Sequence, residues 1–217
     1  MEYHPPSNKA LEIYYEDESL LIVNKPSGLL SVPGRGEDKQ DCLISRIQDE
    51  YSDAIIVHRL DMSTSGLMII ARGKKMERCL SILFQKRKIA KKYIAVVNGA
   101  VTPSSGEINL PLITDWPNRP KQKIDFTSGK KSYTRYKLLS YDNKNNTSRL
   151  ELTPVTGRTH QLRLHMLAIN HAILGDKLYA DKEVIEKSPR LLLHASYLSF
   201  QHPVTEIIIE LNSKPEF

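Results

Sequence analysis

The chain of 217 residues is long enough for one substantial domain or for two smaller subdomains that share a core. Its 31 Lys and Arg against 25 Asp and Glu give a formal net charge of +6. Its two cysteines are too few for a disulfide framework or for the usual structural zinc site. No apolar run reaches the roughly eighteen residues of a membrane helix, and the first residues lack an apolar signal region. We therefore expect a soluble, cytoplasmic, folded protein.

The expected elements are short strands interrupted by two helices. Runs of β-branched, aromatic and aliphatic residues between turn-forming residues predict the strands. In chain order we expect strands at 11–15, 20–24, 54–58 and 66–71, a helix at 73–87, strands at 92–98, 132–141 and 148–154, a helix at 159–170, and strands at 191–196 and 206–211. Because strands outnumber helices and several are joined by short turns, we expect an α+β fold with a mixed, largely antiparallel central sheet flanked by helices and loops.

The spacing of apolar residues supports both helices. In the first, apolar side chains recur at i, i+4, i+7 and i+8 from Met76, and cations crowd its C-terminal end, where the helix dipole favours them. In the second, Leu162 and Met166 belong to an apolar stripe, and Thr159 is the expected N-cap. Both segments are therefore predicted to pack one face against a core.

The stretch HRLDMSTSG, residues 58–66, places several reactive groups between two apolar strands. Its carboxylate belongs to Asp61. This carboxylate either accepts a hydrogen bond from the backbone amide of Thr64 or Ser65, in an Asx turn, or it takes part in chemistry. Arg163 lies at the edge of the apolar stripe of its helix, and a cation there requires a carboxylate partner because an unpaired buried charge is costly. Asp61 is one candidate partner. Such a pair would lower the pKa of Asp61, which suits a nucleophile better than a general acid.

Several other catalytic patterns are excluded. HRLD lacks the Asp directly after Arg that the kinase loop needs, no glycine-rich phosphate loop is present, and the frame of a nucleophile elbow is missing. His160 and His165 are separated by five positions, about 140° around a helix, so they cannot clasp one metal ion.

The positive charge gathers in the stretches 85–93 and 116–137. The second stretch interleaves cations with Trp116, Phe126 and Tyr133 and contains two prolines, so it cannot be one regular helix. One interpretation is a solvated basic hairpin. The other is a nucleic-acid contact, which needs cations for phosphates and aromatic rings for stacking.

Six sequence blocks resemble, in the right order, those of the RluA-type pseudouridine synthases and cover most of residues 10–200. The blocks are NKPSGLLSVPGRG, HRLDMSTSGLMIIAR, KKYIAVVNG, LPLITDWPNRPKQK, PVTGRTHQLRLHM with ILGDKLYA, and PRLLLHA. The resemblance implies a pseudouridine synthase fold with an active-site cleft across the sheet. It implies a single catalytic domain over 1–217, with two subdomains sharing one sheet and without the S4-like domain of larger relatives.

The resemblance also implies a reaction, in which a uridine within RNA is isomerised without cofactor or metal. Asp61 would be the essential carboxylate, which attacks the sugar C1′, attacks the base C6, or assists proton abstraction at the sugar. Tyr93 matches the pocket tyrosine that packs on the uracil, and Arg163 matches the basic partner of the aspartate. His58 is left out of the catalytic set, because a histidine at a strand end is more often structural.

The remaining roles concern RNA binding. The uridine must be flipped out of its stack, and Arg59 would fill the vacated space. Thr64 and Ser65 would brace the loop, while Gly66 would allow a close backbone approach. The expected partner is structured RNA, contacted through the basic residues of the block LPLITDWPNRPKQK, namely Arg119, Lys121 and Lys123.

The same block resembles the branch of the family that acts on both ribosomal and transfer RNA. Its substrates would be a large-subunit ribosomal stem-loop and the anticodon stem-loop. A monomer is expected, and the alternative function is a non-catalytic RNA-binding chaperone on the same fold.

Overall fold

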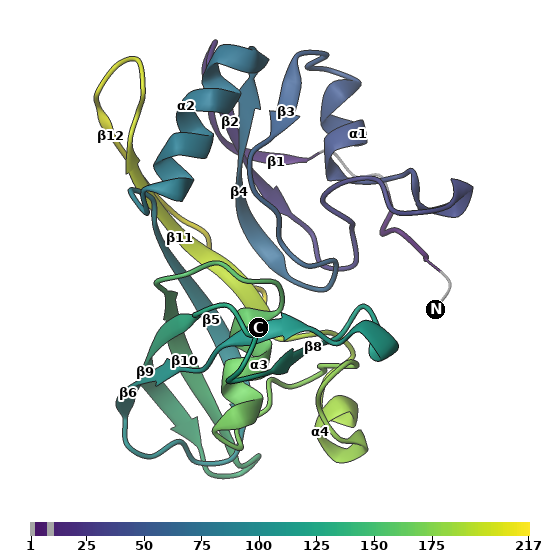
Figure 1. The fold of residues 1–217 in the computed structure, drawn as a ribbon, viewed down its shortest axis with the longest axis vertical. Helices are drawn as coiled ribbons and strands as arrows, with labels where there is room; N and C mark the ends of the chain where they lie inside the picture. The colour runs from purple at the N-terminus through teal and green to yellow at the C-terminus, as the bar shows by residue number, and fades with distance from the viewer. Residues whose placement is uncertain (1–2, 8–10) are drawn as a thin grey trace. The chain divides into compact units, whose positions relative to one another are not determined.

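The computed structural model describes residues 3–7 and 11–217, and the chain divides into two compact units. Unit 1 comprises the described residues up to Lys91 together with Ala195–Glu216. Unit 2 comprises Lys92–His194 and Phe217. Figure 1 follows the chain by colour and labels the main elements. Within the described ranges, no helix is long and apolar enough to cross a membrane.

Unit 1 is built on neighbouring strands. The order is β1 (Glu12–Glu16), β2 (Leu20–Lys25), β4 (Ser65–Arg72) and β11 (Leu193–Gln201), with β3 (Ala54–Ile56) beside β4 and β12 (Ile208–Asn212) beside β11. The pairs β1–β2, β2–β4, β3–β4 and β11–β12 are antiparallel. The register of β2 and β4 places Lys25 opposite Gly66. The segment that follows β2 and the loop that precedes β4 therefore lie at the same end of this strand pair.

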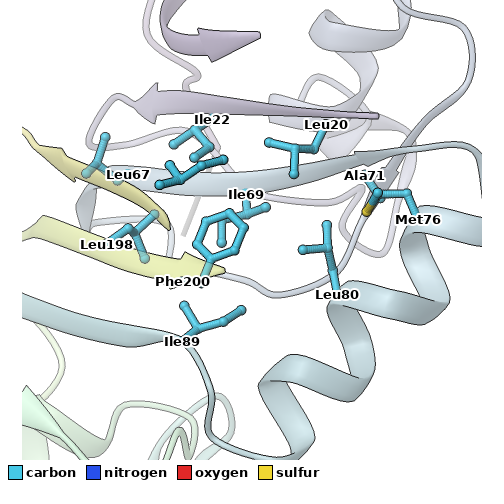
Figure 2. Packing of buried hydrophobic residues seen from close by; sticks show 11 residues of the cluster. Leu20, Ile22, Leu67, Ile69, Ala71, Met76, Leu80, Ile89, Leu198 and Phe200 are labelled. Atoms are coloured by element: carbon cyan, nitrogen blue, oxygen red, sulfur yellow. The ribbon is translucent and has the colours of Figure 1, made fainter. Parts of the chain in front are cut away.

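A hydrophobic cluster joins helix α2 (Gly73–Gln85) to this sheet. Figure 2 shows apolar side chains of α2, β2, β4 and β11 meeting in one cluster, Leu20, Ile22, Leu67, Ile69, Ala71, Met76, Leu80, Leu198 and Phe200 among them. The alternate residues Leu21, Val23, Met68 and Ile70 are buried too. Unit 1 also contains the 3-10 turn η1 (Glu37–Lys39) and the short helix α1 (Leu43–Gln48). Because both faces of β2 and β4 are covered, the end of the strand pair that carries Lys25 and Gly66 is anchored in a packed core.

Unit 2 contains a second set of antiparallel strands, in the order β5 (Ala90–Asn98), β10 (Thr147–Pro154), β9 (Tyr133–Asp142) and β6 (Ser105–Asn109). A separate hairpin is formed by β7 (Leu112–Thr114) and β8 (Gln122–Ile124), with the 3-10 turn η2 (Trp116–Asn118) between them. The helices are α3 (Gln161–Ala168) and α4 (Lys182–Glu186). Helix α3 contacts β8 and β9, so it lies beside the hairpin.

The expected α+β fold with a mostly antiparallel sheet is confirmed, and every strand expected from the sequence is present with shifted ends. The short strands β6, β7 and β8 and the short helices α1 and α4 were not expected. Elements of three to six residues contain too few positions for a periodic pattern to emerge. Their stability comes from neighbouring strands and core contacts that a local pattern does not contain.

Two expectations for helix α3 are wrong. The N-cap is His160, in a left-handed conformation with φ 54°, and not Thr159. His160 is fixed there by its ring, whose Nδ1 lies 2.6 Å from the Tyr179 hydroxyl. The helix also has no single apolar stripe, because all residues from Gln161 to Met166 are buried. A helix enclosed on all sides needs partners for its polar side chains, and these partners build much of the site.

Candidate active site

The loop that carries Asp61 is a tight turn closed by the main chain. The Thr64 amide donates to the Asp61 carbonyl over 3.0 Å, so a main-chain bond closes the turn. Thr64 and Ser65 are buried. Gly66 has φ +117°, and a Cβ there would lie 2.4 Å from the backbone N and O of Ala195. The expected close backbone approach at Gly66 is therefore confirmed.

Lys25 holds this loop from within the core of unit 1. Its side chain is fully buried, and its ammonium group donates to the carbonyls of Pro26 (2.8 Å), Leu29 (2.7 Å) and Met62 (3.1 Å). Because Met62 directly follows Asp61, the Lys25 ammonium group bonds the backbone next to the proposed reacting residue. Three carbonyl dipoles solvate a charge that would otherwise be costly to bury.

The segment after Lys25 adds further bonds to the same loop. The Gly28 amide donates to the Met62 carbonyl over 2.8 Å, and the Ser27 hydroxyl donates to the Ser63 carbonyl over 2.7 Å. The buried Ser31 hydroxyl donates to the Leu60 carbonyl over 2.8 Å and accepts the Leu60 amide over 3.2 Å. Residues 25–31 therefore fix the backbone on both sides of Asp61. We call these residues the loop clamp.

His58 is a structural residue. Its Nε2 accepts the Ile69 amide of β4 over 2.9 Å, and its ring packs on Phe84 with centroids 4.5 Å apart. Burial, together with the nearby Lys91 charge, lowers the pKa of His58 to about 3. The ring is therefore neutral at pH 7 and fastens the start of the loop to β4.

Arg59 differs from its neighbours because its side chain is exposed. Among the residues that the structure describes, no ion pair or hydrogen bond holds its guanidinium. An arginine on a rigid backbone with an unengaged side chain is free to contact a ligand at no cost in internal bonds.

In unit 2, Arg163 forms a bidentate ion pair with Asp176. Arg163 Nε donates to Asp176 Oδ2 over 2.8 Å, and one terminal nitrogen donates to Oδ1 over 2.6 Å. The side chains of the pair are 4% and 2% exposed. The requirement for a carboxylate beside Arg163 is thus met by Asp176, which the sequence analysis did not consider. The pairing of Asp61 with Arg163 stays a prediction.

Tyr179 orients the same arginine and ties it to the hairpin. The Arg163 guanidinium lies 5.0 Å from the centroid of the Tyr179 ring. The Tyr179 hydroxyl accepts the Gln122 amide of β8 over 2.9 Å and lies beside His160 Nδ1. This arrangement links the Arg163 side chain, the start of α3 and the β7–β8 hairpin in one network.

A second network holds α3 on its other side. His165 is fully buried, with Nδ1 2.9 Å from the Thr134 hydroxyl and Nε2 3.1 Å from the Leu110 carbonyl. Burial lowers the pKa of His165, so the ring is neutral, and Nε2–H donates to the carbonyl. The neutral ring fixes the rotation of α3 and with it the position of Arg163.

Tyr93 lies on β5, where it is buried and opposite Leu152 of β10. It is therefore held by a central strand pair of unit 2, whereas Asp61 belongs to unit 1. The role of Tyr93 against a uracil stays a prediction.

The expected RNA-binding residues lie on the β7–β8 hairpin. Trp116 is 65% exposed, and the Arg119 guanidinium lies 4.6 Å from its ring centroid. Lys121 and Lys123 are exposed. The loop is closed by bonds from the Asp115 amide to the Lys121 carbonyl and from the Lys121 amide to the Asn118 carbonyl, both 3.0 Å long. A well-formed hairpin therefore presents an aromatic ring and cations to the solvent.

Sequence reasoning missed Asp176 and the loop clamp. Signals for both were present: Asp176 follows the glycine of ILGD, where Gly175 has φ +71°, and Lys25 ends an otherwise apolar strand before Pro26. Such signals indicate unusual positions but name no partner, because the partners are main-chain carbonyls or residues far along the chain. Among the described residues, no group of three or more His, Cys, Asp or Glu side chains is arranged to hold a metal ion.

Comparisons with known proteins bear directly on this site. The profile of a family described as RNA pseudouridylate synthase matches residues 19–168, which include Asp61, Tyr93 and Arg163. The chain is 51% identical over 201 residues to the dual-specificity RNA pseudouridine synthase RluA of Escherichia coli K12, covering 93% of this chain and 91% of that protein. It is 48% identical to the protein of the same name from Pasteurella multocida, over 100% of this chain and 99% of the relative.

A solved structure agrees with these matches. The human RNA pseudouridylate synthase domain containing 1 protein superposes with a TM-score of 0.82 at 28% identity, covering 99% of this chain and 87% of that one.

Proposed function

Because the chain belongs to the RNA pseudouridylate synthase family, we propose that it converts uridines in stem-loops of ribosomal and transfer RNA to pseudouridine. It is an isomerase. In this reaction the bond between the sugar C1′ and the uracil N1 breaks, and the base rejoins C1′ through C5. The hydrogen at C5 leaves to the solvent as a proton, and N1 takes up a proton in its place.

The observation that carries the proposed mechanism is the position of Asp61 on a loop whose backbone is fixed on both sides. The loop clamp bonds Leu60, Met62 and Ser63, so the backbone that carries the carboxylate is held in place before a substrate arrives. Such preorganisation reduces the entropy lost on reaching the reactive geometry. The reacting carboxylate is Asp61 in this proposal, whether it attacks C1′, attacks C6 or assists proton abstraction.

The other roles follow from the properties of each side chain. Arg59 is exposed and unengaged within the described chain, so it can occupy the space that a flipped uridine leaves in the RNA stack. Tyr93 provides a ring for the uracil. Arg163, oriented by Asp176 and Tyr179, provides a fixed positive charge for the reacting carboxylate.

The substrate class rests on the relatives and on the hairpin. The curated relatives from Escherichia coli and Pasteurella multocida carry dual specificity in their names, and the hairpin block of this chain resembles that branch. The Trp116 ring and the cations of the hairpin, Arg119, Lys121 and Lys123, can stack on a base and neutralise phosphates. We propose that the protein acts as a monomer in the cytoplasm, without cofactor or metal, on RNA that is already folded.

Tritium release from RNA labelled at uridine C5 tests the reaction. Wild-type protein should release tritium from an anticodon stem-loop and from a ribosomal stem-loop, and Asp61→Ala should abolish release while binding is retained. Asp49→Ala, which removes an exposed carboxylate from the end of α1, is the matched control and should release tritium normally. Release that survives Asp61→Ala would overturn the mechanism. Binding without release by the wild-type protein would favour the alternative, a non-catalytic RNA chaperone.

A further inference from the structure

The corner between α2 and β5 concentrates uncompensated positive charge. It contains Lys86, Arg87, Lys88 and Lys91, and no Asp or Glu occurs in the sequence from 78 to 106. None of the four cations forms an ion pair with the residues that the structure describes. By contrast, Lys74 at the other end of α2 pairs with Glu77 over 3.1 Å. We call these four residues the α2–β5 corner.

The backbone at this corner is closed without help from the cations. The Lys88 amide donates to the Leu83 carbonyl over 2.9 Å and the Arg87 amide donates to the Phe84 carbonyl over 3.1 Å, the two bonds of a Schellman motif. Arg87 occupies the left-handed position of the motif with φ 55°, where glycine is usually found because a Cβ is disfavoured there. An arginine at this position weakens the local fold, so folding gives no reason for it.

Lys91 completes the corner in a different way. Its ammonium group lies 5.5 Å from the centroid of the Phe84 ring, and burial lowers its pKa. A partly desolvated cation without an acidic neighbour in the described chain is poorly compensated. An anion from outside the protein would compensate it.

Cations near a helix C-terminus also have a simpler explanation, since they interact favourably with the helix dipole. That explanation covers Lys86 at the C-cap, but it does not require an arginine at a left-handed position or a half-buried lysine beyond the helix. Arg87→Gly, which removes a charge and relieves the backbone, separates the two explanations. A contact with RNA predicts a weaker affinity for RNA, whereas an interaction with the helix dipole alone predicts an unchanged affinity.

We propose that the α2–β5 corner binds the phosphate backbone of the substrate RNA, with Lys91 and Arg87 as its main contacts. The inference rests on the proposed function, because RNA is the polyanion that this enzyme must hold. Each neutralised phosphate releases counterions, so each contact contributes to the affinity and to its dependence on salt. The corner adds to the contacts proposed for the β7–β8 hairpin.

The test measures the affinity of an anticodon stem-loop RNA between about 50 and 200 mM salt by fluorescence anisotropy. For Arg87→Gly we expect an increase in Kd of about threefold to tenfold, a slope of log Kd against log salt that is smaller by about one, and a Tm equal to or above that of the wild type. Lys91→Met, which keeps apolar volume over Phe84, should weaken binding similarly.

Lys75→Gln is the matched control, because Lys75 is an exposed lysine near the opposite end of α2. It should leave Kd and the salt slope unchanged. The proposal is overturned if both Arg87→Gly and Lys91→Met bind within about twofold of the wild type with the same slope, or if Lys75→Gln loses as much affinity. Tritium release by the wild-type protein is measured separately. If the wild-type protein releases no tritium, the proposed reaction is contradicted, whereas the result on RNA binding still stands.

Discussion

Lys25 in unit 1 and Arg163 in unit 2 are both buried cations, but the structure solvates them in different ways. Lys25 donates to three main-chain carbonyls, one of them next to Asp61. Arg163 donates through two nitrogens to the carboxylate of Asp176 and lies over the Tyr179 ring. The first arrangement fixes a backbone, whereas the second fixes the direction of a side chain.

The difference follows from the shapes of the two cations. An ammonium group donates in three directions and suits carbonyls that converge from separate parts of a loop. A guanidinium is planar, so a bidentate carboxylate holds it in one plane and leaves its remaining nitrogens directed elsewhere. The exposed cations of the β7–β8 hairpin, and Lys86, Arg87 and Lys88 of the α2–β5 corner, need neither arrangement, because water solvates them. The buried cations therefore serve the internal architecture, and the exposed ones are those that we propose for RNA recognition.

Breaking the carboxylate arrangement should have the largest effect. Asp176→Asn removes the charge that faces a buried guanidinium, and we expect a loss of about 3–5 kcal/mol in the free energy of unfolding. Urea unfolding followed by circular dichroism measures it. Asp181→Asn is the control, because asparagine caps the α4 N-terminus about as well as aspartate does. A loss below about 1 kcal/mol for Asp176→Asn would show that Asp176 is not the main counter-ion of Arg163.

Removing the lysine that bonds the carbonyls should lower the free energy of unfolding somewhat less than Asp176→Asn does. Lys25→Met fills similar space but leaves the carbonyls of Leu29 and Met62 without the lysine donor, and we expect a loss of about 2–3 kcal/mol in stability. The rate of tritium release should fall further than this loss of fold explains, because the backbone beside Asp61 becomes mobile. Lys25→Arg should not restore the rate, since a planar group cannot reach the same three carbonyls. Full activity of Lys25→Arg would contradict this geometry.

The neutral His58 near the same loop provides a pH test. Its pKa is about 3 in the folded protein against 6.5 for an ordinary histidine, so the unfolded chain binds the extra proton first as pH falls. The contribution to stability is complete above pH 6.5 and is lost toward pH 3. Between pH 7 and pH 5 the loss from this residue should be about 2 kcal/mol. His58→Gln should remove that part of the pH dependence in unfolding experiments, and an unchanged pH profile would contradict it.

The smallest effects are expected at the exposed residues of the β7–β8 hairpin. Trp116→Ala and Arg119→Ala should each weaken binding of stem-loop RNA by about threefold to tenfold, because a stacking surface or a phosphate contact is lost. The Tm should not change, since both side chains are exposed. Anisotropy titrations at two salt concentrations measure the affinity. Unchanged binding in both variants would remove the hairpin from the proposed RNA interface.

The sequence predicted the α+β fold, the main strands and helix α2 well, because each is long enough to show a periodic pattern. It also identified Gly66, whose close approach to Ala195 the structure confirms. It was wrong about the cap of α3, where contacts of His160 with Tyr179 outweigh the ordinary preference for threonine. Short elements such as β7 and β8 were missed because pairing with a neighbour stabilises them.

By itself, the sequence determined the periodic elements, the concentration of charge and the blocks of residues that identify the family. The loop HRLDMSTSG was recognisable because its polar groups are adjacent along the chain. Only the tertiary structure decided that Lys25 holds this loop and that Asp176 holds Arg163. A buried charge takes the partner that folding brings within hydrogen-bond distance. Every residue has a main-chain carbonyl, so the sequence cannot show which carbonyls solvate the charge.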